Sequence, residues 1–185
     1  MVGRSVTIAK RDVRILLAVL MAVLAALGVL WKCGVLGVKE QRVVADAEKK
    51  LEIDEKWWSR SEGDKKQVTG IFYDYGNAPL KGVYYCYVNR SGFSYGFFLQ
   101  KSGNLDRDTK IQKVDLGQCG AAYVSLNSQQ AVKVIRDDGT EPAVKSISPY
   151  APFVVISQKH DCKFRFYDKN GKEIPVFASK TAADD

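Results

Sequence analysis

The order of hydrophobic and polar positions divides the chain into parts of different character. Residues 15–31, ILLAVLMAVLAALGVLW, carry no charge, and the apolar character resumes after Lys32 and continues to Val38. Seventeen helical residues extend about 25 Å, and a lysine side chain can reach out to a membrane surface, so this segment is long enough to cross a bilayer. The pattern predicts a single-pass transmembrane anchor over residues 15–38.

The residues on either side of the apolar run bear on cleavage and orientation. Leu30, Trp31 and Lys32 stand where a signal peptidase needs small side chains, so an uncleaved anchor is favoured over a cleaved signal peptide or a buried soluble helix. Residues 1–14 hold four basic side chains and one acidic side chain. A short basic N-terminus is readily retained in the cytosol. We therefore expect a cytoplasmic N-terminus at 1–14 and an extracytoplasmic C-terminal domain.

The segment 39–66 after the anchor is charged but electrically balanced, with eight basic and eight acidic side chains. Residues 39–62 contain no glycine or proline, and apolar residues recur at helical spacing from Val44 to Trp58. This pattern predicts a helical stalk over 39–66. The apolar stripe is too short for a coiled coil, so contact of Trp57 or Trp58 with the following domain is favoured over a partner-binding face.

From Gln67 onward, short β-rich runs alternate with turn residues. The candidate strands are 68–75, 82–90, 93–100, 109–116, 121–126, 131–137, 153–158, 162–168 and 173–177. No helical pattern separates them, which argues against a parallel α/β sheet and favours an antiparallel sandwich or barrel-like domain. The expected fold class is therefore mainly β, with the domain at 67–178 and a flexible tail at 179–185.

One hairpin is indicated more strongly than the others. In the run 162–168, CKFRFYD, apolar and polar side chains alternate as in a half-buried strand. Lys169-Asn170-Gly171 follows as a tight turn in which Gly171 can adopt positive φ. The second strand contains Pro175, which cannot donate a backbone hydrogen bond and so predicts an edge position.

Tyrosines are crowded into the strands between residues 82 and 100. Tyr84 and Tyr85 must face opposite sides of one strand, so some of these rings lie away from a single core. Exposed tyrosines contact proteins and glycans well, so Tyr84, Tyr85, Tyr87 and Tyr95 are candidates for a binding surface. Burial on both faces of the strand is the alternative.

Export would place three cysteines, Cys86, Cys119 and Cys162, in an oxidising compartment. Three pairings are possible and the sequence does not choose among them; a bridge between Cys119 in a turn and Cys162 at the start of a strand is one that joins two strand ends, and Cys86 is an alternative partner. Because the number of exported cysteines is odd, three free thiols are also compatible with the sequence.

Residues 92–96, GFSYG, match the G-x-S-x-G pattern of a serine-hydrolase nucleophile elbow. That motif needs a strand-to-helix turn, whereas FFLQKSGN after Gly96 carries no helix signal. His160, the only histidine, follows Ser94 in a permissible order but lies in a polar strand end. We therefore expect no catalytic, cofactor or metal residues, and interpret the glycines as permitting a bulge or a close backbone approach.

The net charge of +7 does not predict nucleic-acid binding, because the excess of basic residues is densest in residues 1–14, just before the apolar run. The expected partners are a membrane, crossed once, and proteins or further copies of this chain. We expect a non-enzymatic subunit of an envelope-associated assembly or secretion complex. A surface binding module and an accessory subunit of a membrane enzyme are alternatives.

An apolar helix followed by a polar helix and a β-sheet resembles the layout of type IV pilins and pseudopilins. The resemblance implies a pilin-like subunit as a further alternative. The chain departs from that family in two places, because no Gly-Phe pair precedes the apolar run and no glutamate lies a few residues inside it.

Overall fold

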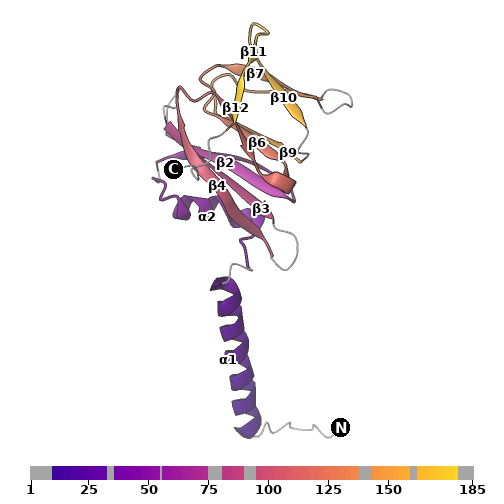
Figure 1. Cartoon of the computed structure of the whole chain (residues 1–185). Coiled ribbons are helices and arrows are strands. Elements are labelled where there is room, and N and C mark those ends of the chain that lie inside the picture. Colours follow the sequence, from indigo (N-terminus) through magenta and orange to yellow (C-terminus); the bar gives the residue numbers. More distant parts are fainter. Residues whose placement is uncertain are drawn as a thin grey trace, which may run out of the picture.

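The computed structural model describes residues 10–32, 36–54, 56–74, 81–89, 95–137, 143–158 and 162–178. An N-terminal helix is followed by a mainly β domain built in layers, which Figure 1 shows as a short helix, α2, and sheets stacked successively away from α1. The prediction of an antiparallel, sandwich-like β domain behind an apolar helix is confirmed. The domain has more layers than a two-sheet sandwich, because its strands form three four-stranded sheets.

The apolar helix α1 runs from Lys10 to Lys32. Its segment Val13–Leu30 is long and apolar enough to cross a membrane, and none of that segment is buried against the rest of the protein. Leucine and valine side chains exposed along a whole helix need a nonpolar environment to cover them.

The predicted helical stalk over 39–66 is wrong in its second half. A single 3-10 turn at Glu40–Arg42 leads into α2, Val43–Lys50, and the helix ends there. Trp58–Gly63 then form the strand β1, which pairs with β2. Helix propensity is a weak local preference, and hydrogen bonds to an existing sheet edge outweigh it.

The first sheet contains four antiparallel strands in the order β1-β2-β3-β4. Its further strands are β2 Gln67–Tyr73, β3 Lys81–Asn89 and β4 Phe97–Asp106. β4 continues through Ser102, Gly103 and Asn104, beyond the end of the strand expected at 93–100. Gly103 pairs with Tyr84, whose ring covers the position that a side chain would occupy.

The middle and outer sheets contain the remaining strands. The middle sheet, in the order β12-β5-β6-β9, consists of β12 Val176–Ala178, β5 Ile111–Asp115, β6 Ala121–Ser125 and β9 Phe153–Ser157. The outer sheet, in the order β11-β10-β7-β8, consists of β11 Glu173–Ile174, β10 Lys163–Asp168, β7 Ala131–Asp137 and β8 Ala143–Ser146. β8, which sequence reasoning did not predict, is exposed at all four residues.

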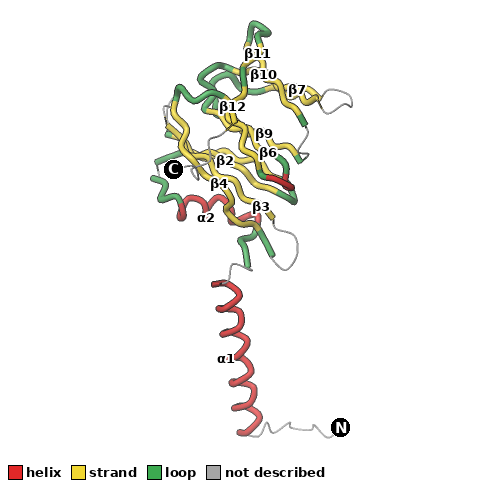
Figure 2. Tube along the Cα trace, viewed as in Figure 1, coloured by secondary structure: helices red, strands yellow, loops and turns green. Residues whose placement is uncertain are grey.

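Alternating side chains place a core on each side of the middle sheet. In β6, Ala122 and Val124 pack toward the first sheet, whereas Ala121 and Tyr123 pack toward the outer sheet. Every residue of β6 is buried, which is expected for a strand covered on both faces. Figure 2 shows these strands as the interior of the domain, with helix confined mainly to the N-terminal part of the chain.

The predicted hairpin at the C-terminus is confirmed. β10 and β11 pair antiparallel, with Phe166 opposite Ile174, and Gly171 in the turn has a φ of +77°. After Pro175 the chain leaves the outer sheet, and β12 pairs parallel with β5 at the edge of the middle sheet. Proline therefore lies between two edge strands, where its missing N–H leaves no ladder position unpaired.

The chain between α1 and α2 is joined to the first sheet by backbone hydrogen bonds. Leu36 bridges Tyr95 and Val38 bridges Phe97, beside the start of the edge strand β4. The amide of Gly37 donates to the carbonyl of Tyr95 at 2.6 Å, and Val38 and Phe97 exchange hydrogen bonds of 2.9 and 2.8 Å. We call residues 36–38 together with 95–97 the junction.

Two glycines allow the strands of the junction to approach this closely. A Cβ on Gly37 would lie 2.7 Å from the carbonyl oxygen of Phe97. A Cβ on Gly96 would lie 2.9 Å from the carbonyl oxygen of Val38, and Gly96 has a φ of +97°. Both contacts are with backbone atoms, so neither can be relieved by rotating a side chain. Close approach was the sequence-based interpretation of the glycines in GFSYG, and Gly96 fits it.

Candidate functional site

The predicted tyrosine surface does not form, because three of its four tyrosines are buried. Tyr84 lies in the core between the first and middle sheets. Tyr85 and Tyr87 point to the opposite face of β3 and pack with α2. Only Tyr95, 68% exposed, remains available for contact. The alternative prediction, burial on both faces of the strand, is therefore correct for β3. The physical cause is that the middle sheet covers one face of β3 and α2 covers the other.

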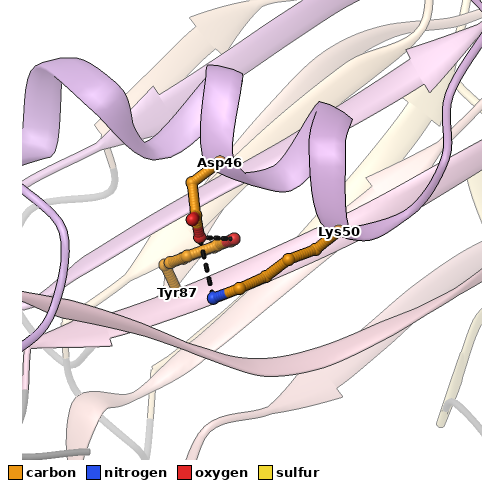
Figure 3. A network of polar contacts seen from close by, with 3 residues as sticks. All are labelled: Asp46, Lys50 and Tyr87. Atoms are coloured by element: carbon orange, nitrogen blue, oxygen red, sulfur yellow. Dashed lines mark hydrogen bonds and ion pairs between the residues drawn. The ribbon is translucent and has the colours of Figure 1, made fainter. Parts of the chain in front are cut away.

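The helix α2 is fixed to the first sheet by apolar and polar contacts. Val43 and Ala47 are fully buried against β2 and β3. The Tyr87 hydroxyl donates to Asp46 Oδ2 at 2.6 Å, and Lys50 Nζ lies 2.9 Å from the same oxygen. Figure 3 shows Tyr87 and Lys50 converging on Asp46 from the sheet and the helix.

This network changes the pKa of both its acidic groups. Burial alone would raise the pKa of Asp46, but the hydrogen bond from Tyr87 and the ion pair with Lys50 lower it below the usual 3.8. Burial and the neighbouring carboxylate both raise the pKa of Tyr87, so its hydroxyl remains a donor. The three side chains therefore act as a latch that holds α2 on the sheet.

Three cysteines lie among the described residues, and all are free thiols. Cys86 and Cys119 both contribute to the core between the first and middle sheets, whereas Cys162 precedes β10 in the outer sheet. The predicted bridge between Cys119 and Cys162 is not formed. Burial raises the pKa of Cys86 to about 12, with the Thr69 hydroxyl acting in the opposite direction.

Ser94 and His160 lie outside the described residues. The part of GFSYG that is described, Tyr95 and Gly96, leads into the strand β4. A nucleophile elbow requires a helix at that point, so the local fold does not match the motif.

A cavity of about 360 Å³ lies where the ends of all three sheets meet. Its lining residues are Gly63, Asp64, Arg136, Ile156, Ser157, Gln158, Cys162 and Phe164. The sequence did not indicate this cavity, because its walls come from four separate strand ends and Gly63-Asp64 was assigned to a helix. Asp64 and Arg136 line the same polar cavity, but they lie far apart in the sequence, so no local pattern indicated that they would meet.

Asp64 is the best-defined polar group in the cavity. Its Oδ1 accepts hydrogen bonds from the amides of Lys66 and Gln67 at 2.7 and 2.9 Å, which closes the turn between β1 and β2. Its Oδ2 is buried and has no hydrogen-bond partner among the residues that the structure describes. A buried carboxylate oxygen without a partner is costly, so this atom is suited to accept a donor from a ligand.

A second surface feature lies along the outer side of β1. Arg60 donates to the carbonyl oxygen of Pro152 at 3.2 Å, and Glu62 pairs with Lys145 of β8 at 2.8 Å. Trp58, two residues before Arg60, is 55% exposed, and Tyr150, two residues before Pro152, is 73% exposed. We call Trp58, Arg60 and Tyr150 the aromatic edge. Tryptophan, tyrosine and arginine are the residues most enriched at protein-binding hot spots.

The two tryptophans of the predicted stalk therefore occupy different environments. Trp57 is half-buried and packs against the core under α2, as a docking residue would. Trp58 begins β1 and is largely exposed. Among the described residues, no three histidine, cysteine, aspartate or glutamate side chains gather as a metal site.

No family model, no curated protein and no solved structure matches the chain.

Proposed function

We propose that this protein is a single-pass membrane protein whose β domain serves as a non-enzymatic subunit of an envelope-associated assembly, acting through protein contacts. The observation that carries the proposal is the helix α1, whose apolar segment Val13–Leu30 has no cover within the chain. The basic N-terminus supports a cytoplasmic position for residues 1–14 and an extracytoplasmic position for the domain.

The aromatic edge supports a protein partner and indicates where it binds. Trp58 and Tyr150 offer large, rigid apolar surfaces, and Arg60 is held beside them by its bond to Pro152. Rigid aromatic side chains lose little conformational entropy on binding, which makes them effective contact residues. We therefore propose the aromatic edge as the principal contact surface with the assembly.

The test is purification of the full-length protein from its native membrane after mild crosslinking, followed by mass spectrometry of the intact subunits. We expect stable protein partners to co-purify, and Trp58→Ala and Tyr150→Ala to lose them. Phe177→Ala is the matched control, because Phe177 is an aromatic residue 45% exposed on β12. Recovery of the chain alone, or equal losses for all three variants, would contradict the proposal.

The cavity supports a second candidate function, binding of a small zwitterionic molecule such as an amino acid. Asp64 Oδ2 offers an acceptor for an ammonium group, and the Arg136 side chain lines the same cavity. Its volume of about 360 Å³ falls within the range of small-molecule sites. A polar cavity with opposite charges on its walls suits a ligand that carries both charges.

This candidate is tested by isothermal titration of the full-length protein in detergent with free amino acids. Asp64→Asn keeps the acceptor that closes the β1–β2 turn but replaces the unpartnered oxygen with an amide, so binding should be lost without loss of the fold. Lys163→Ala, on the exposed side of β10, is the control. Absence of binding to the unmodified protein would reject this function.

A further inference from the structure

We propose that the face of the domain formed by Tyr95, Lys39 and Arg42 lies on the lipid headgroups of the bilayer that α1 crosses. This inference rests on α1 being a membrane span and adds the part of the domain that touches the lipid. We call these three residues the membrane face.

The chain between α1 and the first sheet is short. α1 ends at Lys32, and the junction begins at Leu36, so four residue steps, at most about 14 Å of extended chain, separate them. Leu36 is bridged directly to Tyr95, and neighbouring strands lie about 5 Å apart. The backbone of Tyr95 is therefore confined near the level at which α1 leaves the hydrocarbon.

The junction keeps the start of β4 close to the chain that follows α1. Three backbone hydrogen bonds, from Gly37, Val38 and Phe97, fix residues 36–38 to the start of β4. Only the four residue steps from Lys32 to Leu36 therefore separate α1 from the first sheet. Figure 1 shows α2 and the first sheet at the end of the domain nearest α1.

The exposed side chains of the membrane face suit a lipid headgroup surface. Tyr95 is 68% exposed, and a tyrosine ring with its hydroxyl suits the boundary between acyl chains and water. Lys39 and Arg42 are exposed, and so is Lys32 at the end of α1. Glu40 is the one acidic residue between Lys32 and Arg42, so this stretch is net positive. Anionic headgroups attract basic residues at such positions.

The test places a photoreactive benzoylphenylalanine at chosen positions of the full-length protein in vesicles of phosphatidylcholine and phosphatidylglycerol. Tyr95 is replaced on the membrane face, and Tyr150 is the matched control, because it is a similarly exposed tyrosine on the aromatic edge. Leu24, in the middle of the apolar segment of α1, is the positive control. After illumination, intact-protein mass spectrometry measures the lipid adducts.

We expect lipid adducts at residues 95 and 24, and none at residue 150. An adduct at residue 24 without one at residue 95 would overturn the inference and leave the membrane anchor intact. No adduct at residue 24 would show that α1 is not in the bilayer, which would remove the proposed anchor as well. A protein dimer at residue 95 in place of a lipid adduct would assign the face to a second copy of the chain.

A second position makes the result independent of Tyr95 itself. Lys39 is exposed between the junction and the 3-10 turn Glu40–Arg42, and in a separate variant it is replaced by the same photoreactive residue. A lipid adduct at residue 39 is expected, and its absence together with absence at residue 95 would reject contact of this face with lipid.

Discussion

The two faces of the first sheet are closed in different ways, although both present tyrosines from the same strand. Toward the middle sheet, Tyr84 joins a core of apolar side chains contributed by two sheets. Toward α2, Tyr85 and Tyr87 pack under a helix of eight residues, and the edge of that contact is closed by Asp46 and Lys50. The middle sheet covers its neighbour over a larger area, and the buried Gln67 of β2 donates across that contact to the carbonyl oxygens of Cys119 and Ser157. A short helix covers less area, and polar bonds secure it.

On both faces of the first sheet, a tyrosine ring covers a glycine of the neighbouring strand. Gly70 pairs with Tyr85 on the α2 face, and Gly103 pairs with Tyr84 on the other. Each tyrosine ring lies over its glycine and fills the space that a side chain would occupy. Aromatic cover of this kind compensates for the weak strand propensity of glycine. The two faces therefore share the packing of a tyrosine ring over a glycine. The charged latch of Asp46, Lys50 and Tyr87 distinguishes the α2 face.

The largest effects are expected from removing the tyrosine rings, and they should be similar on the two faces. Tyr84→Ala and Tyr85→Ala each leave a large cavity beside a glycine, and each should lower the free energy of unfolding by about 3–5 kcal/mol. Urea unfolding of the full-length protein in detergent measures both. A loss of unfolding free energy in Tyr84→Ala alone would show that packing under α2 contributes little to the stability of the domain.

The glycines beneath the rings should give the next largest effects. A Cβ on Gly70 would overlap the hydroxyl end of Tyr85, which is fully buried, so Gly70→Ala should destabilise by about 1–3 kcal/mol. A Cβ on Gly103 would lie 2.8 Å from Tyr84 Cε1, a milder contact, so the cost of Gly103→Ala should be about 1 kcal/mol. Urea unfolding of the two variants shows which substitution lowers the free energy of unfolding more. The reverse order would mean that Tyr85 moves more easily under the helix than Tyr84 moves between sheets.

The latch makes the α2 face the one that responds to pH. The pKa of Asp46 is lowered in the folded protein, so this carboxylate stabilises the fold above its unfolded pKa of about 3.8 and loses that effect as the pH falls through the folded pKa. Tyr87→Phe removes the donor and should cost about 1 kcal/mol at neutral pH. It should also reduce the loss of stability in acid. An unchanged acid transition in Tyr87→Phe would exclude the latch as its cause.

The smallest effect concerns reactivity and leaves the fold intact. On the middle-sheet face, burial raises the pKa of Cys86 to about 12, so its thiol should resist alkylation in the native protein. Cys119 is half-buried and should react first. Mass spectrometry after brief alkylation of a Cys33→Ser variant, with and without denaturant, locates the labels. Rapid native labelling of Cys86 would reveal opening between the first and middle sheets.

Local patterns predicted the parts of the fold that depend on nearby residues. The uninterrupted apolar run predicted α1, and the alternation in CKFRFYD with Gly171 predicted the hairpin of β10 and β11. The pattern failed for β1, because WSRSEG is charged and its strand form depends on pairing with β2. β8 was missed for a similar reason, since AVKS is short and exposed.

The sites required information that no local pattern contains. Tyr85 and Tyr87 read as a surface until α2, about forty residues earlier in the chain, is placed over them. The cavity depends on Gly63, Ser157 and Arg136 meeting from three sheets. Tyr95 was identified from its residue type, but its place beside the end of α1 follows only from the pairing with Leu36.

The junction also has a mechanical consequence. α1 is a rod of 23 residues, about 34 Å long, joined to a sheet edge through paired strands. A pull on the domain away from α1 would load the hydrogen bonds that join residues 37 and 38 to residues 95 and 97. Their rupture would lengthen the covalent connection between α1 and α2 without breaking the chain, so the junction sets the force at which the domain can move further from the helix.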